Sequence, residues 1–192
     1  MSELDNFREV NEIEKKIILN SLFKISSKTV KSLENKNYFL FISFNNLTRN
    51  GFPLIYLTPS AITKLLSIRN VKNNTISAGI FFGFIRKGEF MLSLECIEFL
   101  LKQNWISENQ KLYLTIEGEK SVLYGNQIKK NMIERISTSL KKNSYIVIFN
   151  IKKEFIAIGK SNIHYEDFER SKSDDIIVIN LVDKGYYLRK KQ

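Results

Sequence analysis

The stretch Lys111–Ile136 constrains the fold of this chain more than any other. Its first six residues alternate polar and apolar side chains, which is the spacing of a half-buried strand. Gly118 is expected to break that strand before a short helix. Gly125 stands where such a helix needs a left-handed closing residue, a conformation that glycine adopts without a Cβ penalty. The stretch therefore predicts a strand, a short helix, a glycine turn and a basic loop.

The rest of the C-terminal half has the pattern of short strands separated by polar turns. Strands are expected over Ser144–Asn150, Phe155–Gly159, Asp175–Leu181 and Tyr186–Arg189. The first two are predicted to form a hairpin with Lys152 and Lys153 at its tip, and a polar connection follows from Lys160 to Asp175. Many short strands with one early helix favour a small β-barrel.

The N-terminal half predicts an α+β domain with an antiparallel sheet. Apolar residues at helical spacing predict an amphipathic helix over Asp5–Phe23, and Tyr38–Phe44 is rich in strand-forming residues. Thr58-Pro59 is expected to open a second helix, which a polar loop over Val71–Thr75 follows. The pattern leaves open whether Cys96–Leu101 is helix or strand. No regular strand–helix–strand rhythm favours a parallel sheet.

Composition and charge bound the function more loosely. The 192 residues carry a net charge of +10, which suits an anionic partner such as nucleic acid or a membrane surface. The alternative is that the basic excess is incidental to a Lys- and Asn-rich sequence. Residues 1–105 and 106–192 each contribute +5, so a binding face has to come from local clustering. A linker is expected near residues 102–110, which gives domains over residues 1–105 and 106–192.

Cysteine usage and hydropathy suggest the compartment. The single Cys96 excludes an internal disulfide and a Cys-rich metal site. With no signal peptide pattern, the sequence favours an intracellular, reducing compartment. No apolar run approaches the ~18 residues that a transmembrane helix needs, so no membrane partner is expected.

Motifs for catalysis are largely missing from the sequence. It contains no dinucleotide fingerprint that opens a helix after a strand, no P-loop and no G-x-S-x-G. His164 has no cysteine or second histidine at metal spacing, so we expect a surface histidine. Cys96 lies among apolar residues and is expected to be a buried, inert thiol. The sequence thus predicts a protein that is not an enzyme and that uses no cofactor and no metal.

Basic residues at loop tips and strand ends remain as the candidate functional residues. Lysines at such places can meet phosphates as point charges, although any one of them alone is more typical of a solvated surface. The candidate RNA-binding residues are Lys160, Lys152, Lys153, Arg170, Lys172, Lys129 and Lys130.

Three segments carry a resemblance to a known family. They are Gly79–Phe90 (GIFFGFIRKGEF), Lys111–Asn126, which ends in LYGN, and Ile177–Arg189 (IVINLVDKGYYLR). In this order and spacing they resemble the Nip-seven family of PUA-domain large-subunit ribosome-biogenesis factors, with an archaeal-like member as the nearest type. Two features depart from the family pattern. Met132 and Glu134 replace small residues before Arg135-Ile136, and the polar connection Ile163–Asp174 is long.

The resemblance implies an α/β N-terminal domain that contacts proteins and a C-terminal PUA domain, a small barrel that binds RNA. It implies a non-catalytic factor in pre-rRNA processing and large-subunit assembly that binds U-rich single strands. Large-subunit proteins and the RNA exosome would be its partners. The protein would act in the cytoplasm of an archaeon, or in the nucleus or nucleolus of a eukaryote. By position, Lys160-Ser161 match a Lys-Ser pair of the family, so Lys160 is the first candidate RNA contact.

Two other functions remain open from the sequence. An RNA-modification enzyme or its subunit could use a PUA domain to hold RNA, but it would need a cofactor loop or a catalytic Asp in residues 1–105, which are poor in such motifs. A protein adaptor could carry the basic charge incidentally. A steep salt dependence of RNA binding would argue against the adaptor.

Overall fold

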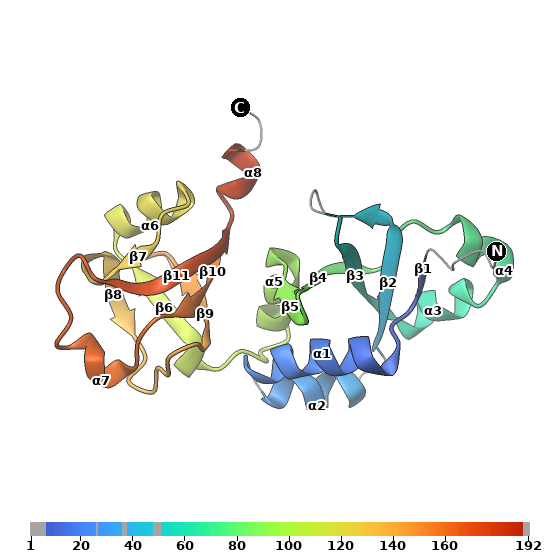
Figure 1. The fold of residues 1–192 in the computed structure, drawn as a ribbon, viewed down its shortest axis with the longest axis horizontal. Coiled ribbons are helices and arrows are strands. Elements are labelled where there is room, and N and C mark those ends of the chain that lie inside the picture. Colours follow the sequence, from blue (N-terminus) through green and yellow to red (C-terminus); the bar gives the residue numbers. More distant parts are fainter. Residues whose placement is uncertain (1–6, 26, 36–37, 48–50, 190–192) are drawn as a thin grey trace. The chain divides into compact units, whose positions relative to one another are not determined.

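The computed structural model describes residues 7–25, 27–35, 38–47 and 51–189. The chain divides into two compact units, Met1–Trp105 and Ile106–Gln192 (Figure 1). The first is an antiparallel sheet with helices, and the second is a curled, mostly antiparallel sheet with short helices. The predicted α+β class is therefore confirmed.

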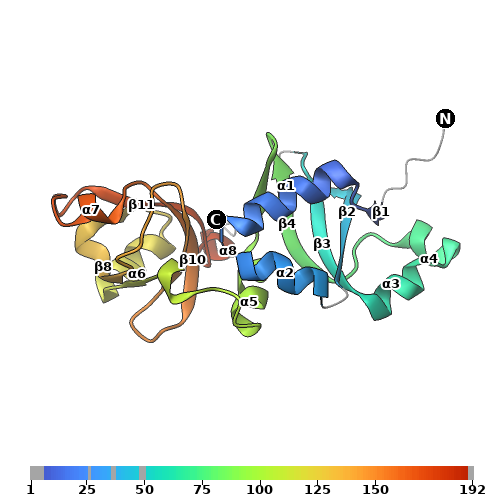
Figure 2. The same cartoon turned by 90° about the horizontal axis from the view of Figure 1, so that it is seen from below.

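The N-terminal unit is built on a five-stranded antiparallel sheet in the order β1-β2-β3-β4-β5. Its strands are β1 Phe7–Glu9, β2 Tyr38–Leu47, β3 Pro53–Pro59, β4 Ile80–Arg86 and β5 Glu89–Leu92. Its helices are α1 Glu12–Phe23, α2 Ser27–Asn35, α3 Ser60–Leu66, α4 Arg69–Asn74 and α5 Leu94–Lys102. Figure 2 shows α1 and α2 side by side and running across the strands, with α3 and α4 at the β1 edge.

Successive side chains of β2 and β3 point to opposite faces of the sheet, as the two-residue period of a strand requires, and both sets are buried. Phe41 of β2 and Tyr56 of β3 are cross-strand partners, and both pack with Phe7 and with Leu66 of α3. Ile42 and its partner Ile55 lie at the intervening positions and are also buried. The sheet therefore buries apolar side chains from both sets of alternating positions.

The single helix predicted over Asp5–Phe23 is wrong. Phe7–Glu9 forms strand β1 on β2, where Phe7 stacks on Phe41 with ring centroids 5.2 Å apart. The helix begins only at Glu12, because Asn11 and Glu14 form a capping box: the Asn11 side chain accepts from the Glu14 N–H, and the Glu14 carboxylate accepts from the Asn11 N–H. Asp5 itself lies outside the described residues.

Two smaller predictions in this unit also fail. The polar loop expected at Val71–Thr75 overlaps helix α4. Thr58 does not cap α3; its hydroxyl donates to the Ala78 carbonyl within the sheet, and α3 begins after Pro59. The undecided segment Cys96–Leu101 is helix α5, whose start is fixed by the Ser93 hydroxyl accepting from the Cys96 N–H.

The C-terminal unit is a six-stranded sheet in the order β7-β11-β10-β9-β6-β8. Its strands are β6 Lys111–Leu114, β7 Ile128–Lys129, β8 Ile133–Ile136, β9 Tyr145–Phe149, β10 Phe155–Ser161 and β11 Ile176–Asp183. Its helices are α6 Ile116–Leu123, α7 Tyr165–Phe168 and α8 Tyr186–Arg189, with 3-10 turns η1 Glu108–Gln110 and η2 Lys130–Met132. All pairings are antiparallel except β6 with β9.

The two edge strands of this sheet follow each other in the chain. Only η2 separates the end of β7 at Lys129 from the start of β8 at Ile133. Four peptide steps reach at most about 14 Å, so the sheet has to curl until its edges approach each other. Leu112, Leu114, Ile146 and other apolar residues fill the resulting core. This is the small barrel that the strand pattern predicts.

The opening stretch of this unit follows the prediction in part. Gly125 has φ +90° directly after α6, as expected of the closing residue, and its N–H donates to the Val122 carbonyl. Gly118 does not break a strand; it lies inside α6, whose N-cap Thr115 accepts from the Gly118 N–H. A Cβ at position 118 would lie 2.5 Å from the Met132 carbonyl oxygen, so glycine lets α6 pack against η2.

The last predicted strand, Tyr186–Arg189, is wrong, because this segment is the one-turn helix α8. The Arg189 N–H donates to the Gly185 carbonyl, and the Arg189 guanidinium turns back to Asp183. The two bonds from the guanidinium to the Asp183 carboxylate are both 3.0 Å long. The ion pair between Asp183 and Arg189, and not strand pairing, thus holds the end of the described chain. We call this ion pair the Asp183–Arg189 clamp.

Candidate nucleic-acid interface

The β9–β10 hairpin holds Lys152 and Lys153 at a rigid tip. Asn150, which is 2% exposed, accepts from the Glu154 N–H and donates to the side chains of Glu154 and Glu119. The Lys153 N–H closes the turn on the Asn150 carbonyl, with Lys153 at φ +63°. Asn150 binds both the turn and Glu119 of α6, so the backbone that carries the exposed Lys152 and Lys153 side chains is held in place.

Two further basic residues lie near this tip. Lys111 Nζ is 2.6 Å from the Glu108 carboxylate, and Arg135 stacks over the Tyr113 ring at 4.2 Å. The hydrogen bond from Lys111 lowers the pKa of Glu108; burial opposes this, and the charges of Lys111, Arg135 and Lys153 reinforce it. We call Lys111, Arg135, Lys152 and Lys153 the hairpin cluster.

The tertiary structure assembles the hairpin cluster from three separate segments. β6, which begins at Lys111, pairs in parallel with β9, so Lys111 lies opposite Val147 and Tyr113 opposite Phe149. β8 pairs on the other side of β6 and places Arg135 opposite Tyr113. Lys111 and Arg135 are absent from the sequence-based candidates. Only the strand order brings them to the hairpin, and no local pattern encodes that order.

The candidates Lys129 and Lys130 have internal roles. Lys130 Nζ donates to the carbonyls of Glu169 and Ser171, at 3.0 and 2.8 Å, and lies over the Phe168 ring. Lys129 pairs with Asp174 at 3.1 Å, in a largely exposed ion pair of the kind that contributes little to stability. Both lysines fasten the connection between β10 and β11 to strand β7, and the Lys130 ammonium has two carbonyl partners already.

Lys160, Arg170 and Lys172 form a different group at the other end of β10. Lys160 is half-buried on β10 between Tyr145 and Ile179, and the other two are exposed in the connection. β10 spans Phe155–Ser161, so at about 3.3 Å per residue Lys160 lies roughly 20 Å from the hairpin tip. Within the described parts of the chain, these three side chains have no hydrogen bond or ion pair. The structure thus separates the seven predicted residues: Lys152 and Lys153 lie at the hairpin tip, Lys129 and Lys130 bind groups of the protein, and Lys160, Arg170 and Lys172 lie away from both.

Other polar residues of this unit, Asp183, Arg189 and Asn180, stabilise the fold. The Asp183 carboxylate, 5% exposed, binds Arg189, whose guanidinium also donates to the Leu123 carbonyl. Asn180 donates to the carbonyls of Val122 and Asn126. These bonds tie the segment Leu123–Asn126 to β11, and the Asp183 carboxylate raises the pKa of Arg189. The two family-like segments at 123–126 and 177–189 are therefore packed against each other.

Cys96 has the setting of an inert thiol. It is fully buried, and desolvation raises the pKa of the Cys96 thiol well above its ordinary value, an effect that the neighbouring Glu95 increases. A thiol in that state stays protonated and is a poor nucleophile. The described residues contain no group of three or more His, Cys, Asp or Glu side chains placed to hold a metal ion.

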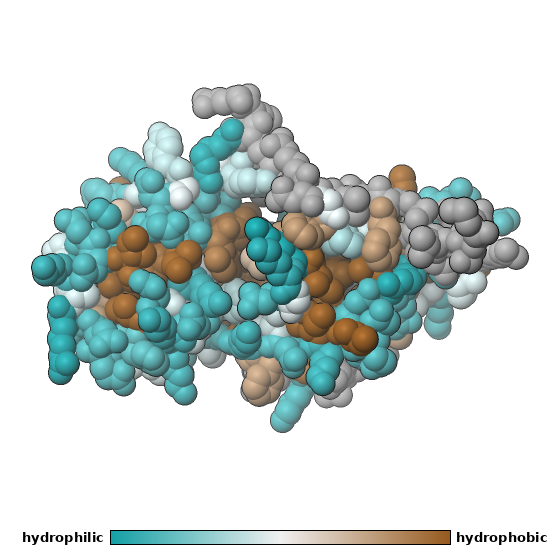
Figure 3. Space-filling view, viewed as in Figure 1, coloured by the Kyte–Doolittle hydropathy of each residue, from teal (hydrophilic) through white to brown (hydrophobic). Residues whose placement is uncertain are grey.

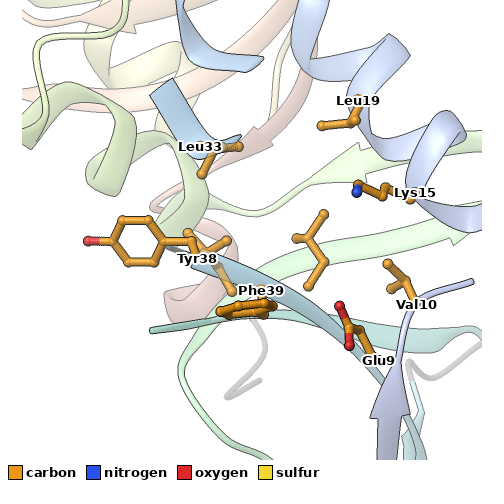
Figure 4. Close-up of a pocket in the computed structure, with 9 residues that line it drawn as sticks. Glu9, Val10, Lys15, Leu19, Leu33, Tyr38 and Phe39 are labelled. Atoms are coloured by element: carbon orange, nitrogen blue, oxygen red, sulfur yellow. The ribbon is translucent and has the colours of Figure 1, made fainter. Parts of the chain in front are cut away.

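A pocket of about 350 Å³ lies in the N-terminal unit, between α1, α2 and the strands (Figure 4). Leucine, valine and aromatic side chains make up most of its wall, together with Glu9 and Lys15. Figure 4 shows the Tyr38 hydroxyl pointing away from the other lining side chains. The wall of the pocket is thus mostly apolar, with one carboxylate and one ammonium group.

The surface of both units mixes hydrophilic side chains with hydrophobic patches, as Figure 3 shows for the face in view. None of the helices in the described ranges combines the length and the apolar character required to cross a bilayer. In the C-terminal unit, Ile179 and Leu181 of β11 are exposed beside Lys160, the cross-strand partner of Ile179.

Comparison with known proteins defines the class of the C-terminal unit. Residues 110–192 match the model of the UPF0113 PUA domain. The whole chain superposes on a hypothetical protein of Pyrococcus horikoshii with a TM-score of 0.61, covering 92% of this chain and 93% of that one. A conserved PUA domain protein of Thermoplasma acidophilum gives 0.56, covering 96% and 98%. Both are 12% identical, so they show a shared fold, that of PUA-domain proteins.

Sequence relatives then give the family. The UPF0113 protein of Archaeoglobus fulgidus is 30% identical over 112 residues, which are 58% of this chain and 61% of that protein. The 60S ribosome subunit biogenesis protein NIP7 of Saccharomyces cerevisiae is 23% identical over 184 residues, 95% of this chain and 96% of that protein. Residues 110–192 are thus similar to the UPF0113 PUA domain, and the resemblance of the chain to the Nip-seven family is confirmed.

Proposed function

We propose that this protein is a non-catalytic RNA-binding factor in the assembly of the large ribosomal subunit. The observation that carries the proposal is the similarity to yeast NIP7, which extends over 95% of this chain. That relative is named a 60S ribosome subunit biogenesis protein. The finer parts of the proposal are pre-rRNA processing, a preference for U-rich single strands, contacts with large-subunit proteins and a link to the RNA exosome. The place of action is then the cytoplasm of an archaeon or the nucleolus of a eukaryote.

The hairpin cluster is the part of the C-terminal unit that best suits RNA. Lys152 and Lys153 are exposed on a rigid turn and have no side-chain hydrogen bond or ion pair within the described chain. Such ammonium groups can replace the counterions of successive phosphates. Next to them the Tyr113 ring is packed between Arg135 and Phe149, so the exposed Arg135 guanidinium offers the planar group on which an unpaired base can stack.

The group of Lys160, Arg170 and Lys172 is a second possible contact on the same unit. Its ammonium and guanidinium groups also lack partners in the described chain, and the exposed Ile179 beside Lys160 adds apolar surface. At about 20 Å from the hairpin tip, Lys160 would meet a phosphate several nucleotides along the same strand. Lys129 and Lys130 would contribute less, because both already bind groups of the protein.

The test is binding of single-stranded poly-U and poly-A to the full chain over a salt series. We expect poly-U to bind more tightly, with affinity that falls steeply as salt rises. In the variant Lys152→Ala/Lys153→Ala, we expect weaker binding and a slope of log K against log salt that is shallower by about 1.4, since each lost phosphate contact removes about 0.7.

The matched control is Lys141→Ala/Lys142→Ala. These lysines are exposed just before β9, whereas the hairpin tip follows its end, and the substitution removes the same charge. Equal loss in both double variants would mean that net charge, or the basic residues at the Lys160 end of β10, attract RNA as much as the hairpin tip does, and would contradict a special role of the tip. No binding by the wild-type chain at low salt would leave the basic charge incidental and would favour the protein adaptor.

A further inference from the structure

The N-terminal unit carries an exposed aliphatic surface on α3, α4 and the residues around them. Leu65, Ile68, Val71 and Ile76 are 57%, 54%, 41% and 58% exposed. They fall within twelve residues, and backbone bonds from Ile68 to Leu65 and from Lys72 to Ile68 link the two helices. We call these four residues the α3–α4 patch. Four exposed aliphatic side chains in one short stretch are more than the single scattered ones of an ordinary surface, and large exposed apolar patches mark interaction sites.

The patch is not a face that the unit needs for its own core. On α3, Leu66 is 5% exposed and packs with Phe7, Phe41 and Tyr56, and Ile62 packs beside it. These two residues are one helical turn apart and fasten α3 to the sheet. Leu65 lies next to Leu66 in the chain but points away from that cluster. The helix therefore has an anchored side and a separate apolar side that faces solvent.

The charged residues that lie near the patch in the sequence are of one sign. Between Glu34 and Glu89 the sequence contains seven Lys or Arg residues and not one Asp or Glu in 54 residues. Lys64 and Lys72 lie within the same two helices as the patch, and Lys64 is exposed. The equal net charges of the two halves of the chain do not reveal this local excess of positive charge. A partner with carboxylates around its apolar residues would be complementary to it.

The side chains also discriminate between kinds of partner. RNA bases stack on planar groups, but leucine, isoleucine and valine present no planar face. A membrane-surface helix needs a continuous amphipathic length, whereas α3 and α4 have seven and six residues. Aliphatic knobs with a basic border match a short amphipathic protein segment, whose apolar residues recur at helical spacing.

We propose that the α3–α4 patch docks an acidic amphipathic segment of a partner protein. Leu65, Ile68 and Val71 would receive the apolar residues of that segment, and the exposed Lys64 would face its Asp and Glu side chains. This surface is separate from the RNA contacts proposed for the C-terminal unit, so each proposal can fail without the other.

The test uses a phage-displayed library of random 16-residue peptides selected against the full chain. We expect the enriched peptides to carry a net negative charge and apolar residues three or four apart. Their affinity should fall at least tenfold for Leu65→Ser/Ile68→Ser and for Lys64→Glu, and should weaken as salt rises. The matched control is Ile13→Ser/Phe23→Ser, which changes two apolar residues of α1 that are 73% and 63% exposed. The control should bind as the wild type does.

Several outcomes would overturn the proposal. One is enrichment of neutral or basic peptides, another is enrichment of no peptide at all, and a third is equal loss of affinity in the patch variant and the α1 control. Poly-U binding and binding to vesicles of phosphatidylcholine with phosphatidylserine are measured on the same variants. If Leu65→Ser/Ile68→Ser weakens either of these instead, the patch serves RNA or a lipid surface. Thermal melting of every variant separates loss of binding from loss of fold.

Discussion

Single polar residues fix the ends of the elements in this protein. Asp183 is the clearest case, because its buried carboxylate receives both arms of the Arg189 guanidinium. Arg189 also donates to the Leu123 carbonyl, and a Cβ at Gly185 would collide with that same carbonyl. Gly185 thus leaves the room that the arginine and the Leu123 carbonyl occupy.

Replacement of Asp183 should therefore destabilise the C-terminal unit. In Asp183→Asn, the guanidinium loses its charged partner while it stays partly buried, and we expect a loss of about 1–3 kcal/mol in the free energy of unfolding. Urea denaturation measures it. The control is Asp174→Asn, whose carboxylate is 80% exposed against Lys129 and should change stability by no more than about 0.5 kcal/mol. Equal effects of the two substitutions would contradict the clamp.

At the scale of elements, helix α1 starts where its capping box places it. Burial by itself would raise the pKa of Glu14, but hydrogen bonds from Arg8 and from the Asn11 N–H, with the charge of Arg8, outweigh it and lower that pKa. A carboxyl with a lowered folded pKa contributes stability above its unfolded pKa and loses it as pH falls through the folded value.

The variant Glu14→Gln should accordingly be less stable than the wild type near neutral pH, by up to about 1 kcal/mol. The difference should shrink as pH falls below about 4.5, the ordinary value of the glutamate pKa. The Glu14 carboxylate is then protonated first in the unfolded chain and, at lower pH, in the folded protein, so its contribution to stability is lost. Denaturant titrations at several pH values test this. The matched control is Glu12→Gln, which lies in the same helical turn but outside the capping box and should cost less stability near neutral pH. A gap that stays constant down to pH 3 would refute the assignment.

At the scale of the whole molecule, each compact unit has its own core. The C-terminal core is a cluster of eleven buried apolar residues, all from within Ile106–Gln192. Strand β6 lies inside the sheet between β9 and β8, so this unit completes its own hydrogen-bond ladder. We propose that residues 1–105 and 106–192 are separate domains.

The fragment Ile106–Gln192 should therefore fold without the rest of the chain. We expect a cooperative thermal transition by circular dichroism and a dispersed amide spectrum by NMR. As an internal check, Leu114→Ala within the fragment should lower the midpoint, since it removes a fully buried side chain at a cost of about 2–5 kcal/mol. A fragment without a cooperative transition would show that the boundary is misplaced.

Much of this molecule follows from local sequence. Short apolar runs between polar turns located β9, β10 and β11, because β-branched and aromatic side chains favour strands whatever the rest of the fold. Gly125 was recognisable as the closing residue of α6, since a left-handed backbone restricts which residue fits. The turn chemistry of Asn150–Glu154 likewise placed Lys152 and Lys153 at a tip.

Other features depended on pairing between distant segments. Phe7 has the helical spacing of its neighbours, yet its place is on β2, because stacking on Phe41 and the capping box at Asn11 stabilise a strand there. The sequence predicts a strand at Tyr186–Arg189, but the segment is a helix in which Arg189 binds Asp183 and the distant Leu123 carbonyl. In both cases a tertiary contact outweighed a weak local preference.

The candidate RNA surface shows the same division. The sequence by itself determined which residues are basic and which stand at turns, because charge and turn chemistry are local. The tertiary structure decided that Lys130 binds carbonyls of its own chain and that Lys111 and Arg135 join the hairpin tip. The physical reason is strand order: the parallel pairing of β6 with β9 is a long-range contact, and it brings together residues that no local pattern relates.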